Sequence, residues 1–341
     1  MAAPVCLIVN PAAGGGKAGR LAPEVERTLS GHGLTVRRAD TRDLGHAREL
    51  AREAARAGET VVALSGDGLV GVIADELRAV PGAVLGVIPG GRGNDLARVL
   101  GIPVDPLEAC ATIAGGVTRA MDVGEVCALE EPERGQAFVG IASAGFDSDA
   151  NRIANEAPSW LGGLVYAYGA LRALLSWRPA RFEIELDPPG ERHTFVGYSI
   201  AAANSKAYGG GMLVAPDALL DDGKLEVVVI EQVGRLAFLA NLPKVFKGEH
   251  VLLPSVKVFR AAEIEVSADR PFTMYADGDP IGDLPLRVRA VAGAVSVLVP
   301  VGASSAFASP PPAPAASGCA EPGSSTAAAT ARAPDERPPG G

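Results

Sequence analysis

Two short apolar runs stand out in the sequence, Val61 to Leu64 and Val84 to Ile88. Each is typical of a buried strand, and each stops at a glycine-rich turn with an acidic residue, Asp67 in the first turn and Asp95 in the second. Between the runs, apolar residues recur at helical spacing: Leu69, Val72, Ile73, Leu77 and Val80. A strand, helix, strand crossover makes the two strands parallel, so both turns lie at one edge of the sheet. Because α/β sheets bind ligands at that edge, the pattern predicts a phosphate site there.

The alternation of strand and helix extends from Val5 to about Gly116. It predicts a Rossmann-like α/β domain with a mainly parallel sheet over residues 1–121. The pattern then changes to short strands separated by turns, which predicts a β-rich domain, a β-sandwich, over residues 122–302. Its strands are expected at 182–186, 224–230, 255–259, 263–266 and 286–291, and the last of them is a candidate to return to the N-terminal domain.

Two further segments have unusual composition. The segment from Trp160 to Trp177 is strongly apolar, with Arg172 as its only charge. It is either a helix packed on the sandwich or a wall of a lipid-accepting cleft. Residues 303–341 consist mainly of Ala, Pro, Ser and Gly, so they are expected to form a disordered tail without a catalytic role.

Composition narrows the classes of function. Of the 341 residues, 48% are hydrophobic, which is ample for two cores. The formal charge of -9, without a basic stripe, argues against nucleic acid as the main partner. The four cysteines are far apart and none is near a histidine, so neither a zinc site nor a disulfide framework is indicated and a reducing cytoplasm fits. The sequence contains no secretory signal and no run of the roughly 18 apolar residues that a membrane span needs.

A glycine-rich loop follows the first predicted strand and reads Asn10-Pro11-Ala12-Ala13-Gly14-Gly15-Gly16-Lys17. Such a loop exposes backbone N–H groups to an anion, and Lys17 can add a point charge. The loop is not a Walker A motif, because Ala18 stands where that motif has Ser or Thr to hold magnesium. An ordinary tight connection between strand and helix remains the alternative.

Five motifs together resemble a known family. They are Asn10-Pro11 with its glycines, Ser65-Gly66-Asp67-Gly68-Leu69, the run from Pro89 to Arg98 (PGGRGNDLAR), Gly145-Phe146-Asp147, and Tyr275-Ala276-Asp277-Gly278-Asp279. Their order is that of the diacylglycerol kinase catalytic family. Over about residues 3 to 300 the chain is similar to the soluble bacterial lipid kinases and to the related sphingosine and ceramide kinases. Each motif alone is a weak signal, whereas five in register are specific.

The resemblance implies an N-terminal domain that binds ATP and a C-terminal β-sandwich that receives the lipid. The implied nucleotide-binding residues are Asn10, Lys17, Thr41, Ser65, Gly66, Asp67, Gly68, Leu69, Val70, Gly71, Arg92, Gly93, Asn94 and Asp95. The implied acid group for the lipid hydroxyl is Asp279 or Asp277. An Asp-Asp-Gly turn holds a structural divalent ion, Mg²⁺ or Ca²⁺, in some members, and the corresponding ligands here are Asp222 and the carbonyls of Leu219 and Lys224.

The chemistry of phosphoryl transfer explains these residue types. The reaction depends on positioning and charge neutralisation, so backbone N–H groups, a cation and a carboxylate that organises Mg²⁺ carry most of it. Asp67 lies between Gly66 and Gly68, which let phosphates approach the backbone. A carboxylate near the lipid hydroxyl would take its proton, which Asp279 or Asp277 can do. Without the other motifs, the turn from Asp277 to Asp279 would be interpreted as a plain hairpin.

The chain departs from the family at three positions. Arg92 stands where the family often has Thr, Val72 where a Glu follows the glycine turn, and Asp279 where the third residue of the turn is Glu. An Arg can clamp phosphates through two hydrogen bonds or can block the pocket. The Asp is one methylene shorter than the Glu that it replaces.

The predicted function is therefore an ATP- and Mg²⁺-dependent lipid kinase that phosphorylates a primary hydroxyl of a diacylglycerol-like or sphingoid lipid. The alternatives are an NAD kinase-like enzyme, whose family shares a GGDG turn, and a catalytically silent module that binds lipid or nucleotide. The expected partner is a lipid at a membrane surface, without nucleic acid and without a transmembrane segment. The expected location is cytoplasmic and peripheral to the membrane, and a homodimer is left open.

Overall fold

The N-terminal part of the chain alternates strand and helix as the apolar pattern predicts. The computed structural model describes residues 4–146, 148–150, 153, 169, 172–174, 176–303 and 305–308. The elements of the N-terminal part are β1 (Pro4–Val9), α1 (Ala13–Gly31), β2 (Thr35–Asp40), α2 (Leu44–Arg56), β3 (Thr60–Ser65), α3 (Asp67–Leu77), β4 (Val84–Pro89), α4 (Asp95–Val99) and α5 (Pro106–Gly115).

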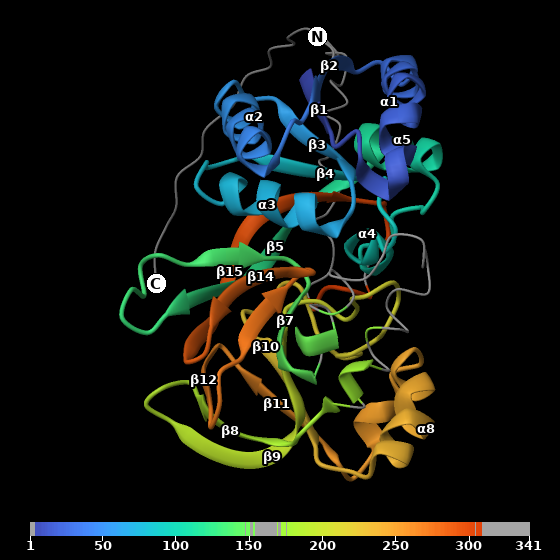
Figure 1. Ribbon diagram of the computed structural model, residues 1–341. Helices are drawn as coiled ribbons and strands as arrows, with labels where there is room; N and C mark the ends of the chain where they lie inside the picture. The colour runs from blue at the N-terminus through green and yellow to red at the C-terminus, as the bar shows by residue number, and fades with distance from the viewer. Residues whose placement is uncertain are drawn as a thin grey trace, which may run out of the picture. The chain divides into compact units, whose positions relative to one another are not determined.

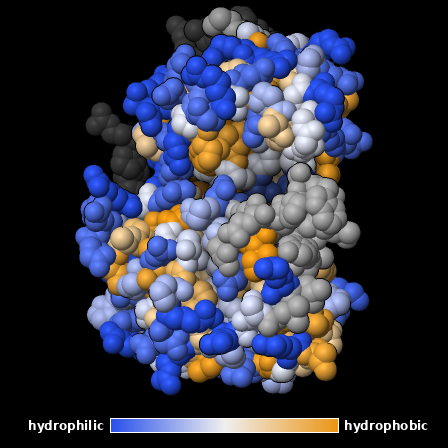
Figure 2. Space-filling view, viewed as in Figure 1, coloured by the Kyte–Doolittle hydropathy of each residue, from blue (hydrophilic) through white to orange (hydrophobic). Residues whose placement is uncertain are grey.

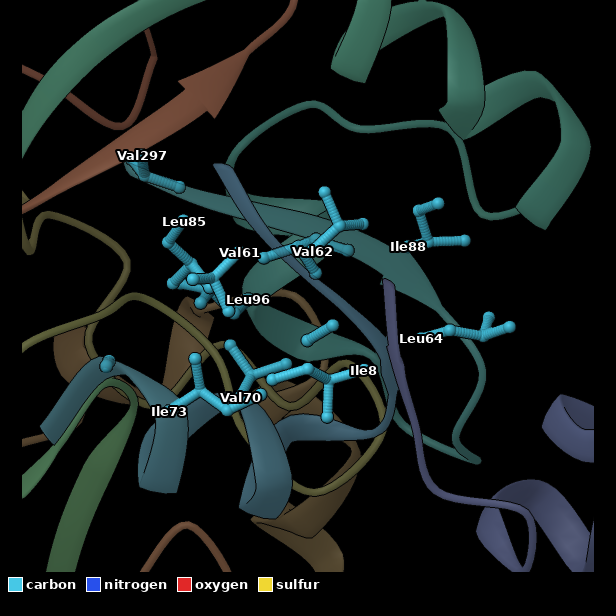
Figure 3. Close-up of a cluster of buried hydrophobic side chains, with 14 of the residues drawn as sticks. Ile8, Val61, Val62, Leu64, Val70, Ile73, Leu85, Ile88, Leu96 and Val297 are labelled. Carbon is cyan, nitrogen blue, oxygen red and sulfur yellow. The ribbon is translucent and has the colours of Figure 1, made fainter. Parts of the chain in front are cut away.

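The first four strands form the predicted parallel sheet, in the order β2-β1-β3-β4. Helices α1 and α5 pack together on one face and α2 and α3 on the other (Figure 1). Strands β1, β3 and β4 are apolar along most of their length because both of their faces are covered, whereas the edge strand β2 is partly exposed and more polar. Figure 3 shows this core, in which Ile8 lies near Val70 and Ile73 of α3, whereas Val62 and Ile88 lie on the opposite face of the sheet.

The C-terminal part is rich in antiparallel strands. Its elements are β5 (Val117–Ala128), β6 (Gln136–Phe138), β7 (Ile141–Gly145), β8 (Ala180–Leu186), β9 (Glu191–Ala203), β10 (Leu225–Glu231), α8 (Arg235–Val245), the 3₁₀ helix η2 (Glu249–Leu252), β11 (Val256–Ala261), β12 (Glu263–Ala268), β13 (Thr273–Ala276), β14 (Asp279–Asp283) and β15 (Leu286–Val299). All five strands expected from alternation are present, as β8, β10, β11, β12 and β15. The predicted fold class, an α/β part followed by a β-rich part, is confirmed.

Two long strands bend and change partners. The first half of β9 pairs with β8, and its second half pairs with β7 and β10, with the change at Gly197. In β15 a bulge separates Val291 from Val295, after which Ser296 and Val297 pair in parallel with β4. Side chains of β15 therefore enter the N-terminal core, as Val297 does in Figure 3. Bulges are a common way for a strand to leave one sheet direction for another.

The residues just after β15 correct one expectation. The sequence pattern assigned everything from Ala303 onward to a disordered tail, but Phe307 is buried and the guanidinium of Arg119 lies 4.3 Å from its ring centroid. The Leu220 N–H donates to the Ala306 carbonyl at 2.8 Å, and the Ala308 N–H donates to Asp221 Oδ1. A single Phe in a polar and small-residue segment suffices to dock it, which composition alone does not reveal. Residues 309–341 lie outside the described residues.

Truncation should distinguish this docked segment from the rest of the tail. A chain that ends at Gly302 loses the buried Phe307 ring, so its free energy of unfolding should fall by about 2 to 4 kcal/mol relative to a chain that ends at Ala308. Thermal unfolding followed by circular dichroism measures the difference. Equal unfolding temperatures for the two truncations would show that Phe307 contributes nothing.

Most of the segment from Trp160 to Trp177 also lies outside the described residues, so both of its interpretations, a helix packed on the sandwich and a wall of a lipid-accepting cleft, stay predictions. Trp177 itself is buried and stacks on Tyr198 in the C-terminal core. None of the helices that the structure describes combines the length and the apolar character that crossing a bilayer requires.

Candidate active site

The glycine-rich turns after β1, β3 and β4 meet at the carboxyl edge of the parallel sheet. They approach so closely that side chains would not fit between them. A Cβ on Gly91 would lie 2.4 Å from the Cα of Gly66, and a Cβ on Gly14 would lie 2.6 Å from the carbonyl oxygen of Gly90. The three turns therefore form one continuous backbone surface, as the predicted phosphate site requires.

The loop after β1 has an unusual backbone. Gly14, Gly15 and Gly16 have φ values of 60°, 68° and 84°, so the chain takes a left-handed course before the regular helix begins. Non-glycine residues rarely adopt this conformation. The side chain of Asn10 fixes the start of the loop, because its Oδ1 accepts the N–H of Ala12 at 3.1 Å. Lys17 is exposed at the end of the loop.

Asn94 holds the turn after β4. Its Oδ1 accepts the Gly91 N–H at 2.8 Å, and its Nδ2 donates to the Gly91 carbonyl at 3.1 Å. Asn94 is buried and has a φ of 54°, which Asn tolerates better than most residues. The turn is tied to β3 by a hydrogen bond from the Gly90 N–H to the Ser65 carbonyl. The side chain of Asn94 therefore holds the turn after β4 in shape, a role that the motif alone does not indicate.

Asp67 joins the two turns that the sequence pattern identified. Its Oδ1 accepts the N–H of Leu96 in the first turn of α4 at 3.0 Å. Its Oδ2 lies 3.2 Å from the position that a Cβ on Gly93 would take. Leu69 and Val70 are buried in the core, so only their backbone can face a ligand. Of residues 65–71, Asp67 thus provides the carboxylate.

Asp95 is a second carboxylate at the same place, and it is buried. Its Oδ2 accepts the N–H of Gly210 at 2.8 Å, and its Oδ1 is without a hydrogen-bond partner among the described residues. Burial raises the pKa of Asp95, and the nearby carboxylate of Asp67 raises it further. A buried carboxylate oxygen without a donor is a position that a cation would stabilise.

The loop that contacts Asp95 was not predicted. Gly209, Gly210 and Gly211 all have positive φ and form a tight hairpin between Tyr208 and Met212, whose backbones exchange two hydrogen bonds of 3.1 Å. Three consecutive glycines are visible in the sequence and could have indicated a second glycine loop. Their contact with Asp95 depends on the tertiary structure.

Asp277 comes from the hairpin between β13 and β14. Its Oδ2 accepts the Val139 N–H at 2.8 Å and its Oδ1 accepts the Gly140 N–H at 2.9 Å. The carboxylate also approaches α3, since a Cβ on Gly71 would lie 3.0 Å from Oδ2. Burial raises the pKa of Asp277 to about 7, and the charge of Asp67 also raises it, whereas the backbone N–H groups lower it.

This pKa predicts a specific dependence of stability on pH. The folded protein holds a proton at Asp277 over a range in which the unfolded chain, with a pKa of 3.8, has released it. The free energy of unfolding should therefore fall as pH rises from about 4 to about 7 and then level off, with a slope on the order of 1 kcal/mol per pH unit. Urea unfolding measures the free energy of unfolding of the wild type and of Asp277→Asn at each pH. Because the asparagine side chain cannot titrate, the difference between the two free energies isolates the contribution of Asp277. A difference that stays constant between pH 4.5 and 7.5 would contradict the raised pKa.

Asp279 follows two residues later, at the start of β14. Its Oδ2 lies 3.4 Å from the position that a Cβ on Gly68 would take, so its carboxylate faces the first glycine turn. Burial raises its pKa, although the residue as a whole is exposed. The structure thus places Asp67, Asp95, Asp277 and Asp279 around the glycine turns, with the last two supplied by the C-terminal half.

An apolar cavity of about 400 Å³ opens in the C-terminal part. Its lining is mostly aliphatic and aromatic, with Phe146, Met212, Phe238 and Val245 among the larger side chains. The glycine hairpin connects this cavity to the carboxylates, because Tyr208 and Gly209 line the cavity while Gly210 contacts Asp95. Such a cavity suits an apolar ligand with few polar groups.

For Thr41, Arg92 and Val72 the structure gives a position but, among the described residues, no hydrogen bond with the carboxylates. Thr41 follows β2, and its N–H donates to the Val9 carbonyl at 2.8 Å. Arg92 is exposed, and Val72, which replaces the family's Glu, is buried in α3. Their predicted contacts with nucleotide stay predictions.

Of the predicted structural-ion ligands, Asp222 already has a partner at each carboxylate oxygen. Asp222 Oδ1 accepts the Lys224 N–H at 3.0 Å, and Oδ2 forms an ion pair with Arg260. The residues therefore fit a divalent ion only if Arg260 moves away. In the described ranges no three His, Cys, Asp or Glu side chains gather as a metal-binding group.

Comparison with known proteins agrees with this geometry. The profile of the diacylglycerol kinase catalytic domain matches residues 4–126, and that of the YegS C-terminal NAD kinase beta sandwich-like domain matches residues 140–299. The chain is 34% identical over 302 residues to a diacylglycerol kinase of Mycobacterium tuberculosis, covering 87% of this chain and 95% of the relative. A diacylglycerol kinase of Bacillus subtilis is 31% identical over 245 residues, or 71% of this chain and 78% of the relative.

The solved structures show the same fold. A crystal structure of a diacylglycerol kinase from Bacillus anthracis superposes with a TM-score of 0.68 at 21% identity, and the alignment covers 88% of this chain and 98% of that chain. With two family profiles that together span most of the chain and relatives above 30% identity, the chain belongs to the diacylglycerol kinase family of lipid kinases.

Proposed function

We propose that this kinase transfers the γ-phosphoryl group of ATP to a primary hydroxyl of a diacylglycerol-like or sphingoid lipid. The observation that supports this most directly is the position of the hairpin from Asp277 to Asp279. It places two carboxylates against Gly68 and Gly71, beside the backbone turns that would hold phosphates. Nucleotide-binding turns and candidate acid groups from opposite halves of the chain thus face one another.

The nucleotide would lie on the backbone surface formed by the three glycine turns. Its phosphates can approach because side chains are absent at Gly14, Gly66 and Gly91, and exposed Lys17 and Arg92 supply positive charge nearby. Mg²⁺ bound with ATP would neutralise phosphate charge. Asp67 and Asp95 fit such an ion, since Oδ1 of Asp95 is buried without a described partner.

The acceptor lipid would place its apolar chain in the cavity of the C-terminal part. The cavity lining offers little that would bind a charged or strongly polar molecule. Its connection to Asp95 through the loop of Gly209, Gly210 and Gly211 would place the polar end of a bound lipid toward the carboxylates. A diacylglycerol or a sphingoid base has both required parts, a long apolar chain and a primary hydroxyl.

The two carboxylates of the hairpin would have different roles. Both oxygens of Asp277 already accept backbone N–H groups, so this residue would fix the hairpin against β7. Asp279 has no described hydrogen bond at its carboxylate and faces the glycine turn, so it would take the proton of the lipid hydroxyl. Its raised pKa makes it a stronger base than an ordinary Asp.

Transfer of radiolabel from γ-labelled ATP to lipids in detergent micelles tests the proposal. The panel should contain diacylglycerol, sphingosine and ceramide, with NAD as a control acceptor. Labelled lipid without labelled NAD is the expected result. Labelled NAD alone would favour an NAD kinase-like activity, and calorimetric ATP binding without any labelled product would favour a silent binding module.

A further inference from the structure

Helix α8 is apolar on two opposite faces. Side chains three or four residues apart share a face of a helix. Phe238, Asn241, Leu242 and Val245 form the inner face and line the cavity. Leu236, Leu239, Ala240 and Pro243 lie on the opposite face, where all four are exposed. A helix that is apolar all round is normally buried in protein or in contact with lipid.

The two leucines on the outer face are unusually exposed for such large apolar side chains. Leu236 is 83% exposed and Leu239 is 40% exposed. The apolar surface continues beyond the helix, because Phe246 is 53% exposed and Leu252 of η2, which packs against α8, is 82% exposed. We call residues 235–258 the α8 edge. Figure 2 shows apolar surface at the lower right, where Figure 1 places α8. Apolar surface of this kind marks an interaction site more often than scattered single residues do.

The charge of the α8 edge differs from that of the whole protein. It contains four basic residues, Arg235, Lys244, Lys247 and Lys257, and a single acidic residue, Glu249, whereas the chain as a whole has a formal charge of -9. Lysines beside an apolar helix face are typical of helices that lie in the interface of an anionic membrane. Their ammonium groups reach the lipid phosphates while the apolar side chains enter the hydrocarbon boundary.

We propose that the α8 edge docks on an anionic phospholipid surface. Leu236, Leu239 and Leu252 enter the boundary between headgroups and acyl chains, and Lys244 and Lys247 contact lipid phosphates. Because the inner face of the same helix lines the cavity, docking places the cavity directly above the membrane, so that a lipid can enter it along α8. This path for the substrate rests on the proposed function, whereas the docking itself does not.

Co-sedimentation of the full chain with vesicles tests docking without any assay of activity. Vesicles of phosphatidylcholine with phosphatidylglycerol are compared with vesicles of phosphatidylcholine alone. The wild type should bind the anionic vesicles, and binding should weaken when NaCl is raised from about 0.05 M to about 0.5 M. The variant Leu236→Ser/Leu239→Ser should lose about tenfold or more in partition coefficient. The variant Lys244→Glu/Lys247→Glu should lose as much on anionic vesicles.

Matched controls come from elsewhere in the chain. Val104→Ser/Val301→Ser removes two other exposed apolar side chains, and Arg56→Glu/Arg134→Glu reverses two other exposed charges. Both should bind vesicles as the wild type does. Docking is overturned if Leu236→Ser/Leu239→Ser binds vesicles like the wild type, or if the wild type prefers neutral vesicles. It is also overturned if the wild type is a dimer in sedimentation velocity and this variant a monomer, because the face then belongs to a second copy.

A second readout separates docking from the proposed function. Phosphorylation of a short-chain diacylglycerol that is dispersed as monomers should be unchanged in Leu236→Ser/Leu239→Ser, whereas phosphorylation of diacylglycerol in anionic vesicles should fall about tenfold. If the wild type binds vesicles but phosphorylates neither form, the proposed function fails and docking stands. If both forms are phosphorylated equally well by all variants, docking fails and the proposed function stands.

Discussion

Asp67→Asn is expected to lower kcat for lipid phosphorylation by at least about 10²-fold to 10³-fold while the protein stays folded. The substitution removes one negative charge from the place where Asp67 and Asp95 would hold Mg²⁺. An Asn keeps the oxygen that accepts the Leu96 N–H, so the link between α3 and α4 remains. Stability should be unchanged or slightly higher, because Asp67 repels the carboxylates of Asp95 and Asp277.

The measurement combines steady-state kinetics with thermal unfolding. Asp105→Asn is the matched control, since it makes the same chemical change at the N-cap of α5, where the side chain accepts the N–H groups of Leu107 and Glu108. That variant should keep its kcat. Near-wild-type turnover by Asp67→Asn would remove Asp67 from the catalytic assignment.

Asp279→Ala should lower kcat by about 10²-fold to 10⁴-fold, the usual contribution of a general base. ATP affinity measured by calorimetry should be retained, because the three glycine turns are unaffected. Asp279→Glu keeps the charge and restores the length found in the family, so it should retain or raise activity. The activity of the wild type should also increase with pH through the raised pKa of Asp279, since the base acts in its ionised form.

Asp283→Ala provides the control for Asp279→Ala. Asp283 lies at the other end of the same strand, where its Oδ1 accepts the hydroxyl of Thr273 at 2.6 Å. Loss of that contact should leave kcat unchanged. If Asp279→Ala turns over normally, the hairpin is only a turn and Asp67 becomes the first candidate for the proton acceptor.

The order of strands and helices in the N-terminal half could be predicted from local patterns of apolar residues. Central strands of a parallel sheet are apolar because both of their faces are buried, and the covering helices have apolar residues at helical spacing. Both patterns can be recognised in the amino-acid sequence without knowledge of the tertiary structure. The glycine turns were also predictable, because positive φ and close backbone approach require glycine at positions such as Gly14 and Gly91. The same local reasoning failed for Phe307, whose burial depends on Arg119 and on other residues far away in the chain.

The sequence of α8 contains many apolar residues, but their spacing alone did not indicate an exposed apolar face. Leu236, Phe238, Leu239, Leu242 and Val245 recur within a short, largely apolar stretch of the sequence. Periodicity alone does not tell which residues face a cavity and which face solvent when both faces are apolar. Only the packing of Phe238 and Val245 around the cavity assigns the two faces.

The α/β part, the β-rich part and the glycine turns could be predicted from the amino-acid sequence, because they follow from interactions between residues close together in the chain. Which groups share the site depends instead on contacts between distant residues. Gly210 donates to Asp95 across 115 positions, and Val139 donates to Asp277 across 138. Those contacts exist because β15 returns to the N-terminal sheet and the β13–β14 hairpin is held against β7. No local pattern encodes such pairings, since each depends on the register of several strands at once.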